Sequence, residues 1–251
     1  MHHIALSIPF DLEGINQEAQ AGRHPRHTMW DLAQTLEAKV HQPDSYSVSF
    51  QDKIAAKLIS QPEHWAMARA LTKQMTQNDV IFCAGEDIGT PFALLYRRQK
   101  YRPKLVMTVM APERFRFRSI IKFFDLANVI DLLVTNTAVK ATFIRDHLGV
   151  DSSKIYVVPE QTDVRFFTPG EATLEKTRPL IASAGREQRD YKTLALATQD
   201  LDLDVDICAI SPNASSSTQV LFPEEVPANM SFHSYDWPEF RQLYRNSDVV
   251  V

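Results

Sequence analysis

The stretch LIASAGREQRDYKTL, residues 180–194, decides the fold of this chain. Its first four residues are apolar or small and predict a buried strand. A turn is predicted at Gly185, and a helix is predicted from about Asp190. The turn carries two arginines, Arg186 and Arg189. A buried strand that enters a helix through a glycine turn is typical of parallel α/β sheets.

This turn is a candidate anion-binding site. The first N–H groups of a helix have no partner inside the helix, and the helix dipole places partial positive charge there. An arginine beside such a terminus presents a planar pair of donors that suits phosphate. An ordinary strand-to-helix turn with two solvated arginines is the structural alternative, and a short motif alone does not decide between the two.

The α/β pattern extends from this stretch in both directions. Strands are predicted at 4–8, 46–50, 79–84, 104–110, 131–135, 155–158, 180–183, 204–210, 230–233 and 248–251. Helices are predicted at 27–40, 52–59, 62–75, 90–98, 119–128, 138–148, 193–200 and 237–245, with Ser60 and Thr90 as caps and polar loops at 11–26 and 211–218. This alternation predicts an α/β fold of parallel sheets with helices on both faces.

Two domains are predicted around a segment of weak pattern that holds Pro169, Gly170 and Pro179. They are a first Rossmann-like domain at 1–165, a linker at 166–179 and a second domain at 180–251. No segment follows the last predicted strand, whereas a parallel strand needs both faces covered. The second domain is therefore predicted to be incomplete, as in a fragment or a truncated product.

Composition limits the function classes. The chain has 251 residues, of which 44% are hydrophobic and 23% charged, which is ordinary for a soluble globular protein. The net charge of −4 argues against a nucleic acid partner, so an anion site would be local. Cys83 and Cys208 lie in apolar runs without metal-ligand spacing and are predicted to be buried thiols in a reducing compartment. No signal peptide or spanning run is present, which predicts a cytoplasmic location and leaves peripheral membrane contact open.

The segment IYVVPEQTDVRFFTP, residues 155–169, taken with the Gly185 turn, resembles the retaining glycosyltransferases of family 4. These enzymes have two Rossmann domains in the GT-B arrangement. Their first domain closes with a strand of the form V-I-P-N-G-V-D, followed by F and P, matched here by Val157, Val158, Pro159, Asp163, Phe167 and Pro169. Their second domain opens with G-R and then K-G before a helix. Here Gly185 and Arg186 match the first pair, and Arg189 and Asp190 stand at the second pair, with Arg for Lys and Asp for Gly.

The resemblance implies a GT-B-like fold and transfer of a sugar from a nucleotide-diphosphate sugar to an acceptor hydroxyl. No metal or other cofactor is implied, since the nucleotide sugar is a substrate. The donor diphosphate would bind at Gly185, Arg186 and Arg189, with Lys192 as an alternative second cation. The acceptor, whether a saccharide, a lipid or a small molecule, is not specified.

The chain also departs from the family pattern. Many members have a histidine after the strand matched here by 106–109, where this chain has Met110, so no catalytic group is assigned. Glu160 and Gln161 replace an Asn-Gly pair. The family's donor-sugar site, with two spaced glutamates, has no counterpart here, which predicts little or no sugar transfer by this chain. A non-catalytic, glycosyltransferase-like binding module is the alternative function, and the glutamate-bearing half of the family pattern discriminates between the two.

Acceptor-side candidates follow two of the predicted strands. Glu86 and Asp87 come after the strand at 79–84, where they would bind acceptor hydroxyls or complement a helix dipole. Arg114 and Arg116, together with Arg118, alternate with phenylalanines after the strand at 104–110. This basic run suits an acidic acceptor or an anionic lipid surface, and a solvated basic turn is its structural alternative. Asp163 is expected to form a turn, and His24 and His27 to lie in a surface loop.

Overall fold

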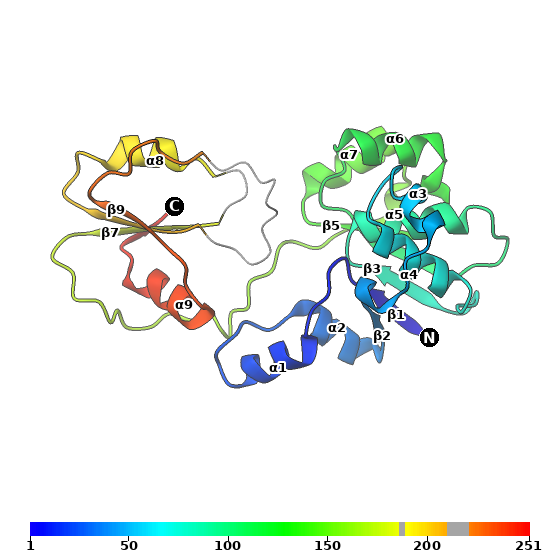
Figure 1. Cartoon of the computed structure of the whole chain (residues 1–251), viewed down its shortest axis with the longest axis horizontal. Coiled ribbons are helices and arrows are strands. Elements are labelled where there is room, and N and C mark those ends of the chain that lie inside the picture. Colours follow the sequence, from blue (N-terminus) through cyan, green and yellow to red (C-terminus); the bar gives the residue numbers. More distant parts are fainter. Residues whose placement is uncertain (186–188, 210–220) are drawn as a thin grey trace. The chain divides into compact units, whose positions relative to one another are not determined.

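The computed structural model describes residues 1–185, 189–209 and 221–251 and contains two parallel sheets (Figure 1). The first sheet is formed by β1 (His2–Ala5), β2 (Lys39–His41), β3 (Val80–Cys83), β4 (Lys104–Thr108), β5 (Leu132–Thr135) and β6 (Ile155–Val157). The helices that precede residue 150 in the chain are α1 (Leu12–Gln20), α2 (Thr28–Leu36), α3 (Phe50–Ala55), α4 (Pro62–Thr72), α5 (Glu86–Tyr96), α6 (Phe115–Phe123) and α7 (Ala138–Leu148), and short 3-10 turns lie at Pro43–Ser45, Leu126–Asn128 and Ser152–Lys154. The predicted α/β fold class is confirmed.

The second sheet is formed by β7 (Leu180–Ala184), β8 (Asp204–Cys208), β9 (Met230–His233) and β10 (Val249–Val250). Its helices are α8 (Tyr191–Thr198) and α9 (Trp237–Asn246), which cover opposite faces (Figure 1). Strand residues alternate between these faces, because successive side chains of a strand point to opposite sides. Ile181 packs with Tyr191 of α8, whereas Ala182 packs with Leu243 of α9.

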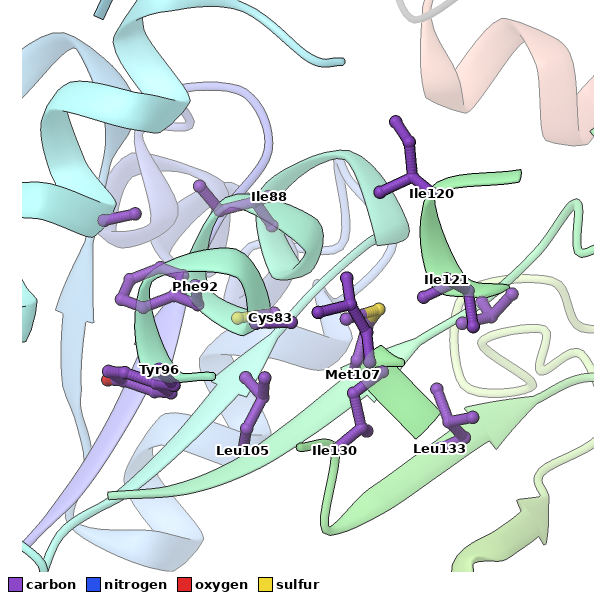
Figure 2. Packing of buried hydrophobic residues seen from close by; sticks show 14 of the residues in the cluster. Cys83, Ile88, Phe92, Tyr96, Leu105, Met107, Ile120, Ile121, Ile130 and Leu133 are labelled. Atoms are coloured by element: carbon purple, nitrogen blue, oxygen red, sulfur yellow. The ribbon is translucent and has the colours of Figure 1, made fainter. Parts of the chain in front are cut away.

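The core of the first sheet follows the same rule. Ile4 and Phe82 contribute to a cluster with Ala33 of α2, whereas Ala5 and Cys83 contribute to the main cluster. Figure 2 shows this main cluster, in which side chains from the strands meet those of the helices, among them Cys83, Leu105, Met107, Ile88, Phe92, Tyr96 and Ile121. Gly89 lets α5 approach β4 closely, since a Cβ at this position would lie 2.6 Å from the Met107 side chain.

The contacts divide the chain into two compact units. One contains Met1–Gly14 and His27–Gln161, and the other contains Ile15–Arg26 and Thr162–Val251. A short segment from the N-terminal part of the chain thus belongs to the unit that holds the second sheet. The predicted domain limits at 165 and 179 stay a prediction.

Several predicted elements near the N-terminus are wrong. Residues 11–26 are not all loop, because Asp11 accepts the Gly14 N–H (2.9 Å) at the start of α1. The helix predicted over 27–40 ends at Leu36, since Glu37 adopts a left-handed conformation and β2 then pairs with β1.

Four further predictions differ from the structure at or near helix starts. No strand forms at 46–50, where Ser49 and Asp52 make a capping box for α3. Ser60 is not a cap: Gln61 precedes α4, and Ser60 has a positive φ. The helix predicted from Thr90 begins earlier, at Glu86, and the Thr90 hydroxyl donates to the Glu86 carbonyl inside it. The helix predicted over 119–128 is α6 and a short 3-10 turn.

Candidate functional sites at the strand ends

Each sheet has one point at which the strand order reverses direction. The first sheet has the order β2-β1-β3-β4-β5-β6, so its reversal lies between β1 and β3. The second has the order β10-β7-β8-β9, so its reversal lies between β7 and β10. Open α/β sheets bind ligands beyond the carboxyl ends of the strands at such points. The two reversals therefore mark two candidate sites.

Ser7 and Asp87 meet at the first reversal. Ala5 pairs with Cys83, so the residues after β1 and β3 reach the same edge of the sheet. The Ser7 hydroxyl donates to Asp87 Oδ1 (2.8 Å), and the Ile88 N–H donates to the same oxygen (3.0 Å). The Asp87 side chain is 47% exposed, so this carboxylate is held in place and still accessible to a ligand.

His64 lies behind this pair and was not predicted as a site residue. Its Nε2 lies 2.7 Å from the Ser7 carbonyl and its Nδ1 lies 2.6 Å from the Ser60 hydroxyl. A carbonyl only accepts, so the neutral ring carries its proton on Nε2 and accepts from Ser60 at Nδ1. The side chain is 2% exposed, and Nδ1 lies 3.9 Å from Asp87 Oδ2. Only its spacing of four residues from Ser60 signals this contact in the sequence.

The other acceptor-side candidates have structural contacts. Glu86 Oε2 accepts the Met110 N–H (3.0 Å), which joins the residues that follow β3 and β4. Arg116 donates to the Lys57 carbonyl (2.6 Å), which ties α6 to the segment after α3. Arg114 is exposed and directly precedes α6. The structure thus brings Glu86, Asp87 and Met110 together, while Arg116 has a packing role.

Gly185 forms the turn at the second reversal. It has a φ of 103°, a region that glycine tolerates and side chains do not. Its N–H donates to the Cys208 carbonyl (3.0 Å), and the Tyr191 hydroxyl donates to its carbonyl (2.5 Å). Asp190 caps α8 by accepting from the N–H of Thr193 (2.9 Å), and this bond lowers the pKa of the Asp190 carboxyl.

The predicted cations differ in their surroundings. Arg189 is exposed, and its Nε would lie 3.3 Å from a Cβ placed on Gly185. Lys192 lies on α8, where its Nζ pairs with Glu224 Oε1 (3.5 Å). Arg189 is therefore the cation that lies against the turn, in preference to Lys192. Arg186 lies outside the described residues.

Across residues 1–185, 189–209 and 221–251, no group of three or more His, Cys, Asp or Glu side chains could hold a metal ion. In the same residues, no helix is both long and apolar enough to cross a membrane.

Comparisons with known proteins bear on the fold. No protein-family model matches the chain, and no curated protein matches it in sequence. The lipopolysaccharide outer core galactosyltransferase WaaB, in its apo form, is 11% identical with a TM-score of 0.54, over 100% of this chain and 73% of that chain. The glycosyltransferase SnogD from Streptomyces nogalater is 9% identical with a TM-score of 0.37, over 100% and 75%. The likeness to the galactosyltransferase shows a GT-B-like fold.

Proposed function

We propose that this protein takes part in glycosyl transfer from a nucleotide-diphosphate sugar to an acceptor hydroxyl. The observation that carries the proposal is the position of the predicted site residues. Gly185 and Arg189 lie at the strand-order reversal of one sheet, and Glu86 and Asp87 lie at that of the other. The GT-B-like fold supports the same function.

On the donor side, the diphosphate would bind at the start of α8. Arg189 and Arg186 would supply positive charge, and the partial positive charge at the N-terminus of α8 would add to it. As the bond from the sugar to the diphosphate breaks, negative charge develops on the leaving group. Fixed cations stabilise that charge without a metal ion. A retaining stereochemical course is part of this proposal.

On the acceptor side, Asp87 is the group best placed to accept a hydrogen bond from a sugar hydroxyl. Ser7 and the Ile88 N–H occupy its Oδ1, which leaves Oδ2 to a ligand. The arginines at 114 and 118 would favour an acidic acceptor or an anionic lipid surface. The exposed Phe115 and Phe123 of α6 are compatible with the lipid alternative.

The donor site is tested by calorimetric titration of uridine and guanosine diphosphates. We expect Arg186→Ala and Arg189→Ala each to weaken binding by about ten- to a hundredfold, because each removes a charge-assisted contact. Arg189→Lys should also weaken binding, since a point charge does not reproduce a planar fork. Arg145→Ala is the matched control, because this exposed arginine pairs only with its neighbour Asp146 among the ion pairs of the described residues.

Equal affinities in the wild type and the arginine variants would contradict the donor site. Nucleotide binding that depends on both arginines, without sugar transfer to any acceptor offered, would favour the binding-module alternative.

A further inference from the structure

A second basic site lies in the unit that holds the second sheet. A cavity of about 210 Å³ is lined by α1, the segment after it, residues 163–166 and α9. All of its lining residues belong to the unit of Ile15–Arg26 and Thr162–Val251. Three arginines, Arg26, Arg165 and Arg241, line it together with one carboxylate, Asp163. The lining therefore has an excess of two positive charges.

Arg26 and Asp163 neutralise one another. Arg26 Nη2 lies 2.7 Å from Asp163 Oδ1, and the Arg26 N–H donates to Oδ2 (2.8 Å). The Asp163 side chain is 7% exposed, and these bonds hold the pKa of its carboxyl well below the ordinary range. Asp163 also accepts the Arg165 N–H (3.0 Å), so it forms a turn as predicted and an ion pair that was not predicted.

Arg241 is a partly desolvated cation, and it forms no ion pair with a carboxylate within residues 1–185, 189–209 and 221–251. Its guanidinium carbon lies 4.5 Å from the centre of the Phe166 ring, and Nη1 is 3.4 Å from the Phe166 carbonyl. Its Nε is buried and has no hydrogen-bond partner among the described residues. A buried donor on a charged group destabilises the fold unless a partner satisfies it. An anion in the cavity would be such a partner.

Arg165 is the other arginine of the cavity lining that forms no ion pair with a carboxylate within the described residues. Its side chain is exposed, while its backbone is held by Asp163. His24 closes the cavity on another side: its Nδ1 lies 2.6 Å from the Pro25 carbonyl, and its ring packs on Trp237 with 5.2 Å between centroids. Gln20 of α1 adds an amide to the lining.

We propose that this cavity binds a phosphate group, held by the guanidinium groups of Arg165 and Arg241. A phosphate monoester carries a charge of about −1.5 to −2 at neutral pH, which matches the excess of two positive charges. A carboxylate would leave one arginine uncompensated. Planar guanidinium groups also suit phosphate oxygens as paired donors. The group can belong to inorganic phosphate or to a phosphorylated sugar. The site shares no residue with the Gly185 turn and does not rest on the proposed donor site.

The test is calorimetric titration of inorganic phosphate and, separately, glucose 6-phosphate into the whole chain. We expect Arg165→Ala and Arg241→Met each to weaken phosphate binding about tenfold or more, through loss of a charge-assisted contact. Arg241→Met keeps an apolar stem against Phe166, and Arg165→Ala changes an exposed side chain, so circular dichroism should report folded variants. Tighter binding of glucose 6-phosphate would identify a sugar phosphate as the source, and equal binding would identify the phosphate group alone.

Arg145→Ala is the control, and it should retain phosphate binding. Absence of saturable phosphate binding by the wild type would overturn the proposal. Wild-type affinity in folded Arg165→Ala and Arg241→Met would also overturn it. Failure of the donor-site test would leave this result unchanged, because it uses different residues.

Discussion

Within each strand-end site, a single glycine is required by the local geometry. A Cβ at Gly85 would lie 2.5 Å from Asp87 Oδ1 and 2.9 Å from the Ser7 hydroxyl, so only glycine leaves this pair undisturbed. Gly185 is needed for a different reason, namely its positive φ. At the first reversal, glycine thus lets the Ser7 and Asp87 side chains, which come from distant parts of the chain, meet at one edge of the sheet.

His41 is a residue whose charge affects the stability of the fold. It is buried, its Nε2 lies 2.9 Å from His3 Nδ1, and its Nδ1 lies 2.7 Å from the Tyr46 hydroxyl. Burial, with smaller contributions from the neighbouring His3 and Lys39, lowers the pKa of His41 to about 4. In the unfolded chain this group binds a proton near pH 6.5, whereas in the fold it stays neutral. Stability is therefore predicted to fall as the pH drops from about 6.5 to about 4, by up to about 3 kcal/mol.

Urea unfolding of the wild type and His41→Gln at a series of pH values measures this effect. The variant should be less stable at pH 7 but should lose less stability on acidification, because it has no imidazole to protonate. Parallel stability curves for the two proteins between pH 7 and pH 4 would show that His41 is not the group responsible.

At the scale of elements, α9 serves both the core and the cavity. Leu243 is buried against Ala182 and Cys208, and Phe240 and Tyr244 pack on the same cluster. Another side of the helix presents Arg241 to the cavity. Any change that frays α9 therefore acts on both.

The capping box of α9 gives a prediction at this scale. Asp236 accepts the Glu239 N–H (2.8 Å), and the Glu239 carboxylate accepts the Asp236 N–H (3.0 Å). Asp236→Ala should lower the free energy of unfolding by about 1 kcal/mol, because a helix N–H loses its partner. Chemical denaturation followed by the fluorescence of Trp237 measures this. Glu239→Gln is the matched control, since its amide oxygen still accepts; equal stability of the two variants would contradict the cap's role.

At the scale of the whole molecule, each sheet has its own core with one buried thiol. Cys83 is fully buried in the core of the first sheet, and Cys208 is 6% exposed in that of the second. Burial raises the pKa of the Cys83 thiol well above its ordinary value. The prediction of buried thiols is confirmed, and each thiol can report on the opening of its own unit.

Labelling with a thiol reagent tests this arrangement. In Cys208→Ser only Cys83 remains, and in Cys83→Ser only Cys208 remains. We expect each thiol to react at least about 1,000-fold more slowly in buffer than in concentrated urea, because the reagent must wait for the unit to open. Labelling of either native protein at the rate measured in urea would show that its thiol does not lie in a packed core.

The sequence by itself determined the fold class and most of its strands. Apolar runs marked β3, β4, β5 and β7, because strands covered on both faces are apolar nearly throughout. The segments that form β8 and β9 were also predicted as strands, although they contain polar residues. Gly149 marked the end of α7, where its φ is 70°. Gly185 likewise marked the turn that precedes α8. These features are local, so neighbouring residues suffice to indicate them. Edge strand β2 and helix α1 were missed because their polar residues show no clear period.

Only the tertiary structure decided which residues meet. Ser7 and Asp87 are 80 positions apart, and Arg26 and Asp163 are 137 apart. Their contacts depend on the order in which the strands pair and on the packing of residues 15–26 with residues 162–251 in one unit. The hydrophobic periodicity of the sequence encodes neither of these. The reversals in strand order, the buried His64 and the cavity at Arg241 follow from that pairing. Local sequence thus specifies strands and helices, whereas sites arise from long-range packing that places charges from separate elements around one space.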